Sequence, residues 1–273
     1  MKDRRIACVG AGNMGQAMLQ GLVGSRSVAP SKITASDRDR QRLRRLHSEL
    51  RVRTASDNRK AVAGADTVLL AVKPQILDRV LAEIREPLAA EALVISVAAG
   101  IPTAKIEGLL GGKPRVVRAM PNIAATVGAS ATAICPGRWA RRNDMRLATR
   151  LFETCGRCTE VEENLMDAVT GLSGTGPMYV FIIIEALSDA GVKVGLGREK
   201  ATELAIQTVV GAAQMVQQTG RHPIFLKDLV TSPGGTAINA LYSMEKTGLR
   251  AVLMDAVEAA TRRSRELGRQ ADD

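Results

Sequence analysis

The chain has 273 residues, of which 45% are hydrophobic and 24% are charged, a balance that excludes disorder as its main state. Its 1 Trp, 2 Tyr, 3 Phe and 2 His are too few to favour a histidine-rich metal site or a platform of stacked aromatic rings. Lysine and arginine outnumber aspartate and glutamate by 38 to 28, which favours anionic small molecules or nucleic acid as partners without choosing between them.

The first half of the chain alternates between short apolar runs and helical patterns. Strands are expected at residues 5–9, 33–36, 67–72, 93–97, 116–119 and 130–135. Helices are expected at residues 13–23, 39–50 and 77–84, with a weaker helical turn at 61–63. Because the strands are apolar on both faces and helices separate them, they require a parallel sheet that is covered on both sides. We therefore predict an α/β Rossmann-type doubly wound parallel sheet.

Strand signals end near Glu160, and the second half is expected to be all α. Its helices are predicted at residues 164–171, 177–191, 199–219, 223–230, 235–247 and 249–267. Residues 179–187 are apolar nearly all round, so this helix has to be buried on every side, which an obligate dimer achieves more easily than one bundle. We predict an NAD(P)-binding domain at residues 1–160 and a helical dimerisation and substrate domain at residues 161–273.

The cysteines, the charge pattern and the apolar runs argue against secretion, a metal site, a nucleic-acid partner and a membrane partner. Four cysteines, two of them in the Cys155 and Cys158 CxxC pair, are too few for a secreted disulfide framework, and the pair lacks two further zinc ligands, so we expect no metal. The basic segment 36–60 interleaves acids and contains no aromatic residue, which argues against a nucleic-acid partner. No secretory signal is visible, and the longest dense apolar run is shorter than the roughly 20 residues of a membrane span. We expect a soluble cytoplasmic protein without a membrane partner.

A glycine fingerprint, GAGNMG at residues 10–15, stands between the first strand and the first helix. Gly10 allows a tight turn, Gly12 lets backbone N–H groups approach a pyrophosphate, and Gly15 lets the helix pack closely on the strand. The start of the helix then presents its partial positive charge to the phosphates. This pattern predicts a dinucleotide site.

The end of the second strand leaves the choice of dinucleotide open. Asp37 lies where an acid accepts a hydrogen bond from the 2′-hydroxyl of the adenosine ribose, which favours NAD. Ser36, Arg38 and Arg40 flank it, and a hydroxyl with guanidinium groups is suited to the 2′-phosphate of NADP.

Seven motifs, spread in order from about residue 5 to residue 268, closely resemble the pyrroline-5-carboxylate reductase family. They are GAGNMG at 10–15, AVKPQ at 71–75, SVAAGI at 96–101, RAMPN at 118–122, DAVTGLSGTGP at 167–177, EALSDAGVKVGL at 185–196 and LKDLVTSPGGTAI at 226–238. The resemblance implies an oxidoreductase that reduces 1-pyrroline-5-carboxylate to L-proline with NAD(P)H, the final step of proline biosynthesis. It also implies a homodimer, which in the family often assembles into a decamer, and NADP(H) as the preferred cofactor, with NAD(H) as the alternative.

The resemblance also implies which residues form the site. Those expected to touch the cofactor are Gly10, Ala11, Gly12, Asn13, Met14, Gly15, Ser36, Asp37, Arg38, Asn58, Ala71, Val72, Lys73, Pro74, Ala98, Ala99 and Gly100, with the last three beside the nicotinamide. Those expected near the substrate, between that ring and the partner's helical domain, are Glu163, Ser173, Gly174, Thr175, Ser232, Gly234, Gly235, Thr236 and Ala237.

Ala237 departs from the family pattern. Family members often carry a threonine there, whose hydroxyl is thought to contact the imine nitrogen. We expect Thr236 and Lys73 to be the catalytic residues, although one step along a helix turns a side chain by about 100° at roughly 3.6 residues per turn. The departure keeps open a catalytically weak NADP(H)-binding relative. A β-hydroxyacid-dehydrogenase-like oxidoreductase is the other alternative, although the usual lysine pattern of its second domain is not clear here.

Overall fold

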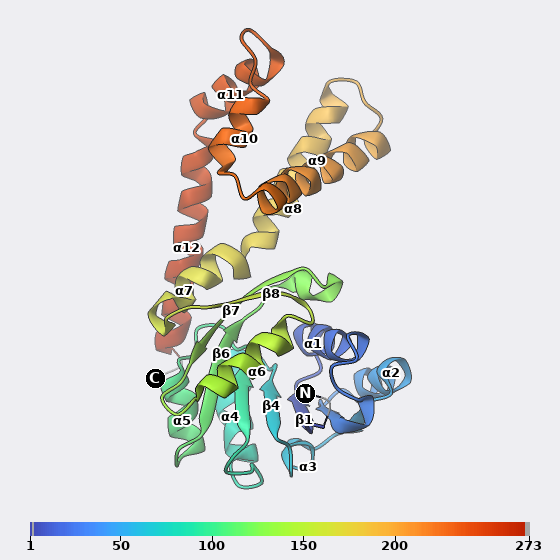
Figure 1. Ribbon diagram of the computed structural model, residues 1–273, viewed down its shortest axis with the longest axis vertical. Coiled ribbons are helices and arrows are strands. Elements are labelled where there is room, and N and C mark those ends of the chain that lie inside the picture. Colours follow the sequence, from blue (N-terminus) through green and yellow to red (C-terminus); the bar gives the residue numbers. More distant parts are fainter. Residues whose placement is uncertain (2, 271–273) are drawn as a thin grey trace. The chain divides into compact units, whose positions relative to one another are not determined.

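The computed structural model describes residues 1 and 3–270, and its centre is an eight-stranded sheet with the order β3-β2-β1-β4-β5-β6-β7-β8. The strands are β1 (Ile6–Val9), β2 (Ile33–Ser36), β3 (Arg53–Ala55), β4 (Thr67–Leu70), β5 (Leu93–Ser96), β6 (Arg115–Met120), β7 (Ser130–Pro136) and β8 (Gly156–Glu160). The first-half helices are α1 (Asn13–Gly24), η1 (Pro30–Lys32), α2 (Arg40–Leu50), α3 (Asn58–Val62), α4 (Pro74–Ile84), α5 (Thr103–Leu110), η2 (Ile123–Val127) and α6 (Arg142–Phe152) (Figure 1).

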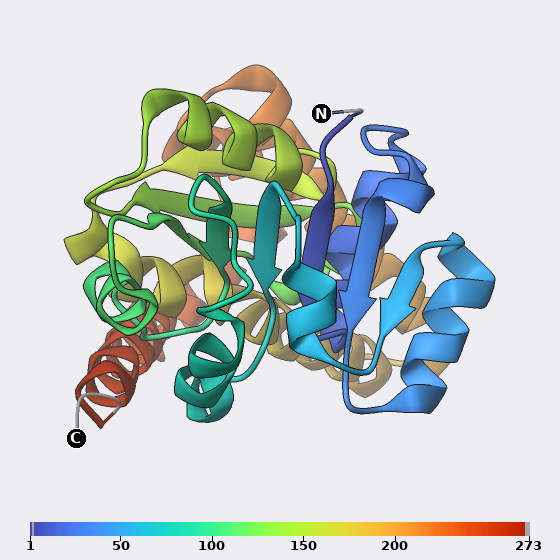
Figure 2. The ribbon, with the colours of Figure 1, turned by 90° about the horizontal axis from the view of Figure 1, so that it is seen from below.

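Both faces of the sheet are buried, as the apolar strands predict. Successive residues of β1 alternate between two cores, with Ile6 and Cys8 in one and Ala7 and Val9 in the other. Helices α1, α2 and α6 supply the first core, whereas α3, α4 and α5 supply the second. Figure 2 shows the strands side by side with helices above and below them. The predicted Rossmann-type layering is confirmed.

The sheet is not wholly parallel, so this part of the prediction is wrong at one edge. β7 pairs antiparallel with β6, in the register Ala119 to Ile134, and β8 runs parallel to β7. The chain between β6 and β7 contains only the short helix η2, whereas a parallel return needs a long crossover connection. Helix α6 then provides such a crossover, which makes β8 parallel to β7.

Besides the short 3₁₀ helices η1 and η2, four elements of the first half escaped the sequence prediction: β3, β8, α5 and α6. β3 and β8 are the two edge strands of the sheet. Their exposed positions carry polar side chains, as in the sequence Gly156–Glu160, and they lack the fully apolar pattern of a central strand. Helix α6 is rich in arginine, yet Met145, Ala148 and Leu151 form a buried stripe on it.

The second half is helical after β8, as predicted. It comprises η3 (Glu163–Leu165), α7 (Met166–Val169), the π-helical turn η4 (Thr170–Gly174), α8 (Gly176–Lys193), α9 (Arg198–Thr219), α10 (Pro223–Leu229), α11 (Thr236–Lys246) and α12 (Leu249–Gln270). The contacts divide the chain into two compact units, Met1–Thr175 with Val257–Asp273, and Gly176–Ala256. The functional boundary at residue 160 stays a prediction.

The unit Gly176–Ala256 has almost no core of its own. Among its residues, all of which the structure describes, only Ser188, Ala201 and Ala205 are buried. They lie where α8 and α9 pack together, and the Ser188 and Thr202 hydroxyls there are 2.7 Å apart. Many large apolar side chains remain exposed, including Phe181, Ile182, Leu187, Leu204, Met215, Tyr242 and Met254. A surface of this kind marks an interaction face.

The helical stretch Glu163–Lys193 contains 31 residues, and an 18-residue window within it has a mean hydropathy of 1.2, so by length and composition alone it is a candidate membrane span. This differs from the sequence expectation, which considered only the densest apolar run. The π turn and α8 join into one helical stretch, so the apolar length exceeds that run. An interface between subunits places the same demand for apolar side chains on this helix.

Candidate active site

The three fingerprint glycines occupy the positions that their predicted roles require. Gly10 has φ +95°, and a β-carbon there would lie 2.5 Å from the carbonyl oxygen of Ala71. A β-carbon on Gly15 would lie 2.1 Å from the carbonyl oxygen of Gly10, so only glycine lets α1 approach β1 this closely. Nothing lies within 4 Å of the position a β-carbon would take on Gly12. That open space next to the first amides of α1 leaves room for the pyrophosphate that the fingerprint predicts.

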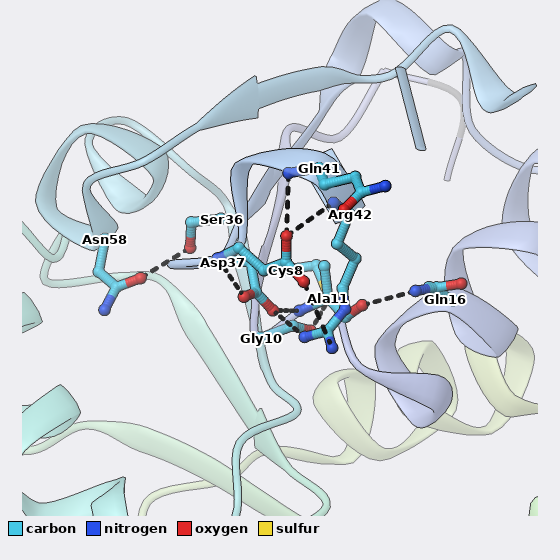
Figure 3. Close-up of polar contacts among 10 residues, drawn as sticks. Cys8, Gly10, Ala11, Gln16, Ser36, Asp37, Gln41, Arg42 and Asn58 are labelled. Carbon is cyan, nitrogen blue, oxygen red and sulfur yellow. Dashed lines mark hydrogen bonds and ion pairs between the residues drawn. The ribbon is translucent and has the colours of Figure 1, made fainter. Parts of the chain in front are cut away.

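Asp37 ties the end of β2 to the glycine loop (Figure 3). Its Oδ2 accepts the backbone N–H of Ala11 at 2.8 Å and lies 3.0 Å from Nη1 of Arg42. Its Oδ1 accepts the backbone N–H of Asp39 at 2.9 Å. Because the carboxylate already has an ion-pair partner and a backbone donor, its charge is partly compensated before any ligand arrives.

Ser36 and Asn58 form a second polar link, on the other side of β2. The hydroxyl of Ser36 is buried and donates to Oδ1 of Asn58 at 2.8 Å (Figure 3). The amide of Asn58 donates to Glu83 at 2.7 Å. The Arg38 side chain is 72% exposed, and its guanidinium lies 4.0 Å from the Glu83 carboxylate. Sequence reasoning placed Ser36, Arg38 and Asn58 near the adenosine, and the structure gathers them at one corner of the sheet, although the Ser36 hydroxyl already has a partner.

Cys8 lies directly beneath the glycine loop. Its thiol donates to the carbonyl oxygen of Gly10 at 3.5 Å. Burial, together with the nearby Asp37 carboxylate, raises the pKa of Cys8 to about 12. The thiol is therefore protonated at neutral pH and packs beneath the loop as a neutral group.

The loops that follow β4 and β5 begin at the same edge of the sheet as the glycine loop, because β1, β4 and β5 are parallel neighbours. In doubly wound sheets ligands bind at this carboxyl edge. Lys73 is the N-cap residue that precedes α4 there, and its side chain is exposed. Ala98 is buried and its N–H donates to Ser96, and Gly100 has φ +76°. The predicted contacts of Ala71 to Pro74 and Ala98 to Gly100 with the cofactor thus lie on one edge.

Glu163, expected near the substrate, holds the start of α5. Its carboxylate accepts the N–H and the hydroxyl of Thr103, both at 2.7 Å, and lies 3.7 Å from the buried guanidinium of Arg118. Arg118 also lies 3.5 Å from Asp167, which accepts the hydroxyl of Ser264 at 2.7 Å. Sequence reasoning missed Asp167 and Ser264. They are 97 residues apart, and the motif around Asp167 was the only signal for either.

The segment Ser173 to Thr175 closes a π-helical turn, a feature that often marks functional sites. The hydroxyl of Thr175 donates to the carbonyl of Thr170 at 3.0 Å, and Asn122 donates to the carbonyl of Ser173 at 2.9 Å. A β-carbon on Gly174 would lie 2.5 Å from the Met120 side chain. This turn therefore packs against the RAMPN motif at the end of β6.

In the other unit, the SPGG turn leads into α11. Gly234 has φ +68°, the N–H of Gly235 donates to the carbonyl of Ser232 at 3.1 Å, and the Ser232 hydroxyl lies over the α-carbon of Gly235. Gly235 caps α11 without a side-chain acceptor, so the first amides of the helix are available to an anion. Thr236 is exposed and Ala237 is half-buried. Within residues 1 and 3–270, no group of three or more metal-ligating side chains occurs.

The family model for pyrroline-5-carboxylate reductase dimerisation matches residues 163–267, and a model for coenzyme F420-dependent NADP oxidoreductase matches residues 5–100. A pyrroline-5-carboxylate reductase of Methanosarcina acetivorans is 46% identical over 270 residues, which covers 99% of this chain and 100% of that protein. The chain belongs to the pyrroline-5-carboxylate reductase family.

Solved structures of this family agree. The pyrroline-5-carboxylate reductase of Coxiella burnetii has a TM-score of 0.91 at 36% identity, covering 97% of this chain and 98% of that one. The Plasmodium falciparum pyrroline carboxylate reductase, solved with NADP bound, has a TM-score of 0.89 at 32% identity, covering 98% and 99%. The β-hydroxyacid-dehydrogenase-like alternative is not favoured by these matches.

Proposed function

We propose that this protein reduces 1-pyrroline-5-carboxylate to L-proline with NADPH. The observation that carries the proposal is membership of the pyrroline-5-carboxylate reductase family along nearly the whole chain, combined with a glycine loop whose three glycines are each sterically placed for a dinucleotide. When bound, the cofactor supplies the hydride for the imine carbon. The protein then has to orient two ligands and neutralise a carboxylate.

The substrate's chemistry matches the donors that the chain offers. A ring imine is basic enough to arrive partly protonated, so a strong catalytic acid is not essential, in keeping with 2 histidines in 273 residues. The free amides at the start of α11 and the Ser232 hydroxyl form a cradle for the substrate carboxylate. Thr236 is the nearest hydroxyl to Ala237 in sequence and takes the contact with the imine nitrogen. Lys73 orients the substrate electrostatically from the cofactor edge. Glu163, Ser173, Gly174 and Thr175 complete the proposed substrate surroundings.

NADPH is the proposed cofactor because of the charges around Asp37. Its carboxylate is engaged by Ala11 and Arg42, which weakens its repulsion of a 2′-phosphate. Arg40 is exposed and forms no ion pair within the described part of the chain, so its guanidinium is free to pair with a phosphate. Arg40→Ala should raise the KM for NADPH about tenfold or more and change that for NADH little, since an isolated charge-assisted contact contributes about 1.5–3 kcal/mol.

We infer that the functional form is a homodimer in the cytoplasm that assembles further into a decamer, with no nucleic-acid or membrane partner. The dimer is supported by the dimerisation model over residues 163–267 and by the exposed apolar side chains of the helical unit.

One assay tests the activity. Purified protein is incubated with 1-pyrroline-5-carboxylate and NADPH or NADH, and nicotinamide absorbance is followed while proline is quantified. Proline formed in step with NADPH oxidation is expected. Absence of turnover with both cofactors would overturn the proposal in favour of a catalytically weak relative that binds NADP(H). Thr236→Ala should lower turnover more than tenfold, whereas unchanged turnover would remove Thr236 from the site.

A further inference from the structure

The last helix touches the loop that follows β5. The α-carbon of Gly100 faces α12, so closely that a β-carbon there would lie 3.1 Å from the backbone N of Gly268 and 3.1 Å from the carbonyl oxygen of Ser264. In the other direction, a β-carbon on Gly268 would lie 2.6 Å from the carbonyl oxygen of Gly100. Ser264 and Gly268 are both buried and lie one helical turn apart. Two glycines thus allow a contact between two backbones.

A network of hydrogen bonds and ion pairs also supports the contact between Gly100 and α12. The hydroxyl of Ser264 donates to Asp167, whose carboxylate lies beside the buried Arg118. Arg118 in turn lies beside Glu163, which binds the backbone and hydroxyl of Thr103. Thr103 stands three residues after Gly100. At one end of this polar network, Glu163 fixes the beginning of α5 through Thr103. At the other end, Asp167 fixes the end of α12 through Ser264, against the loop between β5 and α5.

We infer that the C-terminal turn of α12, through Gly268 and Ser264, is a positioning element that sets where loop 98–101 stands at the cofactor edge of the sheet. The inference rests on the proposed function and on the family resemblance, which implies that Ala98, Ala99 and Gly100 lie beside the nicotinamide. The backbone contact restricts the movement of loop 98–101. A shift toward α12 would clash with its main-chain atoms, and a shift away would break the packing contact. Gly268 and Ser264 act through the loop and touch neither ligand.

The contact predicts an effect on the nicotinamide end of the cofactor alone. On the same proposal the adenosine and pyrophosphate ends lie on the loops after β1 and β2, and among the described residues no hydrogen bond or ion pair joins those loops to α12. A displaced loop 98–101 should therefore misplace the hydride donor without loosening the rest of the cofactor. Misplacement by about 1 Å costs a reaction of this type up to about 100-fold in rate.

The test compares Gly268→Ala with Gly108→Ala in the full-length protein. Both glycines lie in helices, where alanine is the better helix former, so neither change weakens its helix. Nothing lies within 4 Å of a β-carbon built on Gly108, whereas one on Gly268 meets the Gly100 carbonyl oxygen. For each variant, kcat and KM are measured with 1-pyrroline-5-carboxylate. The inhibition constant of ADP-ribose, a fragment without nicotinamide, is measured alongside.

Gly268→Ala should lower kcat about tenfold or more and leave the ADP-ribose inhibition constant within about twofold of the unmodified protein. Gly108→Ala should change neither. A folded Gly268→Ala protein with unchanged kcat overturns the inference, and so does an equal loss of ADP-ribose binding, which indicates general damage. If Gly268→Ala does not fold, Ser264→Ala decides, because it removes the bond to Asp167 without adding bulk: a lowered kcat with unchanged ADP-ribose binding supports the inference, and unchanged kcat overturns it. Failure of the proposed function appears separately, as no turnover by the unmodified protein.

Discussion

The carboxylate of Asp37 accepts the backbone N–H of Ala11 at 2.8 Å, so an acid at the end of the second strand holds the loop at the end of the first. The position is the one that commonly reads the ribose hydroxyl of NAD. Here the same oxygen also pairs with Arg42 at 3.0 Å. The carboxylate thereby shapes the dinucleotide loop before a cofactor binds.

Asp37→Ala should destabilise the protein by about 1–3 kcal/mol, because it leaves the buried Ala11 N–H without an acceptor. Asp37→Asn is the matched control, since its amide oxygen still accepts that N–H while the charge is gone. Urea unfolding of the two variants measures the difference. Equal stability of Asp37→Ala and Asp37→Asn would show that the Ala11 bond contributes nothing.

An added methyl group should affect stability at one glycine of the fingerprint and cofactor affinity at another. Gly15→Ala should lower the free energy of unfolding by about 1–3 kcal/mol, because its β-carbon overlaps the Gly10 carbonyl oxygen. Gly12→Ala should unfold like the unmodified protein, since the space beside it is open, and yet bind NADPH about tenfold more weakly. Denaturant unfolding and fluorescence titration separate the two effects. Unchanged NADPH affinity in Gly12→Ala would place the pyrophosphate elsewhere.

The buried thiols predict a loss of stability in alkali. Burial raises the pKa of Cys8 and Cys135 from an ordinary value of 9.0 to about 12, with smaller contributions from the Asp37 and Glu163 carboxylates, respectively. The unfolded chain therefore releases these protons first, and the free energy of unfolding falls as the pH rises from about 9 toward 12. In a protein carrying Cys8→Ala and Cys135→Ala, urea unfolding across this range should show a shallower fall. Parallel curves for the two proteins would contradict the assignment.

The exposed face of α8 should mediate assembly. Phe181 is 61% exposed and Ile182 56% exposed in the single chain, so Phe181→Asp combined with Ile182→Asp should convert the dimer to monomer and abolish turnover. Lys193→Gln at the end of the same helix is the control and should remain dimeric. Analytical ultracentrifugation gives the masses. A dimer that survives the double substitution would place the interface on another helix.

Local patterns were enough to predict much of this molecule. The glycine loop follows from requirements within six residues, and the central strands follow from runs such as 93–95 that are apolar on both faces. The Asp37 to Ala11 bond joins residues 26 apart, and the Ser264 to Asp167 bond joins residues 97 apart, so no spacing indicates them. The reversal of β7 depends on a short connection, which the apolar pattern of its residues does not encode. These three misses concern interactions that only the folded chain creates, whereas β3, β8 and α6 were missed because polar side chains hide their apolar positions.

Because Gly176–Ala256 has almost no core of its own, the folded fraction of this protein should depend on its concentration. Where a unit buries so few of its own side chains, its folding free energy comes largely from association. Mass action then governs the folded fraction, and dilution lowers the melting temperature without any chemical change. If a cell makes fewer copies of this protein, a smaller fraction of them is folded. Its activity therefore falls by a larger factor than the number of copies does.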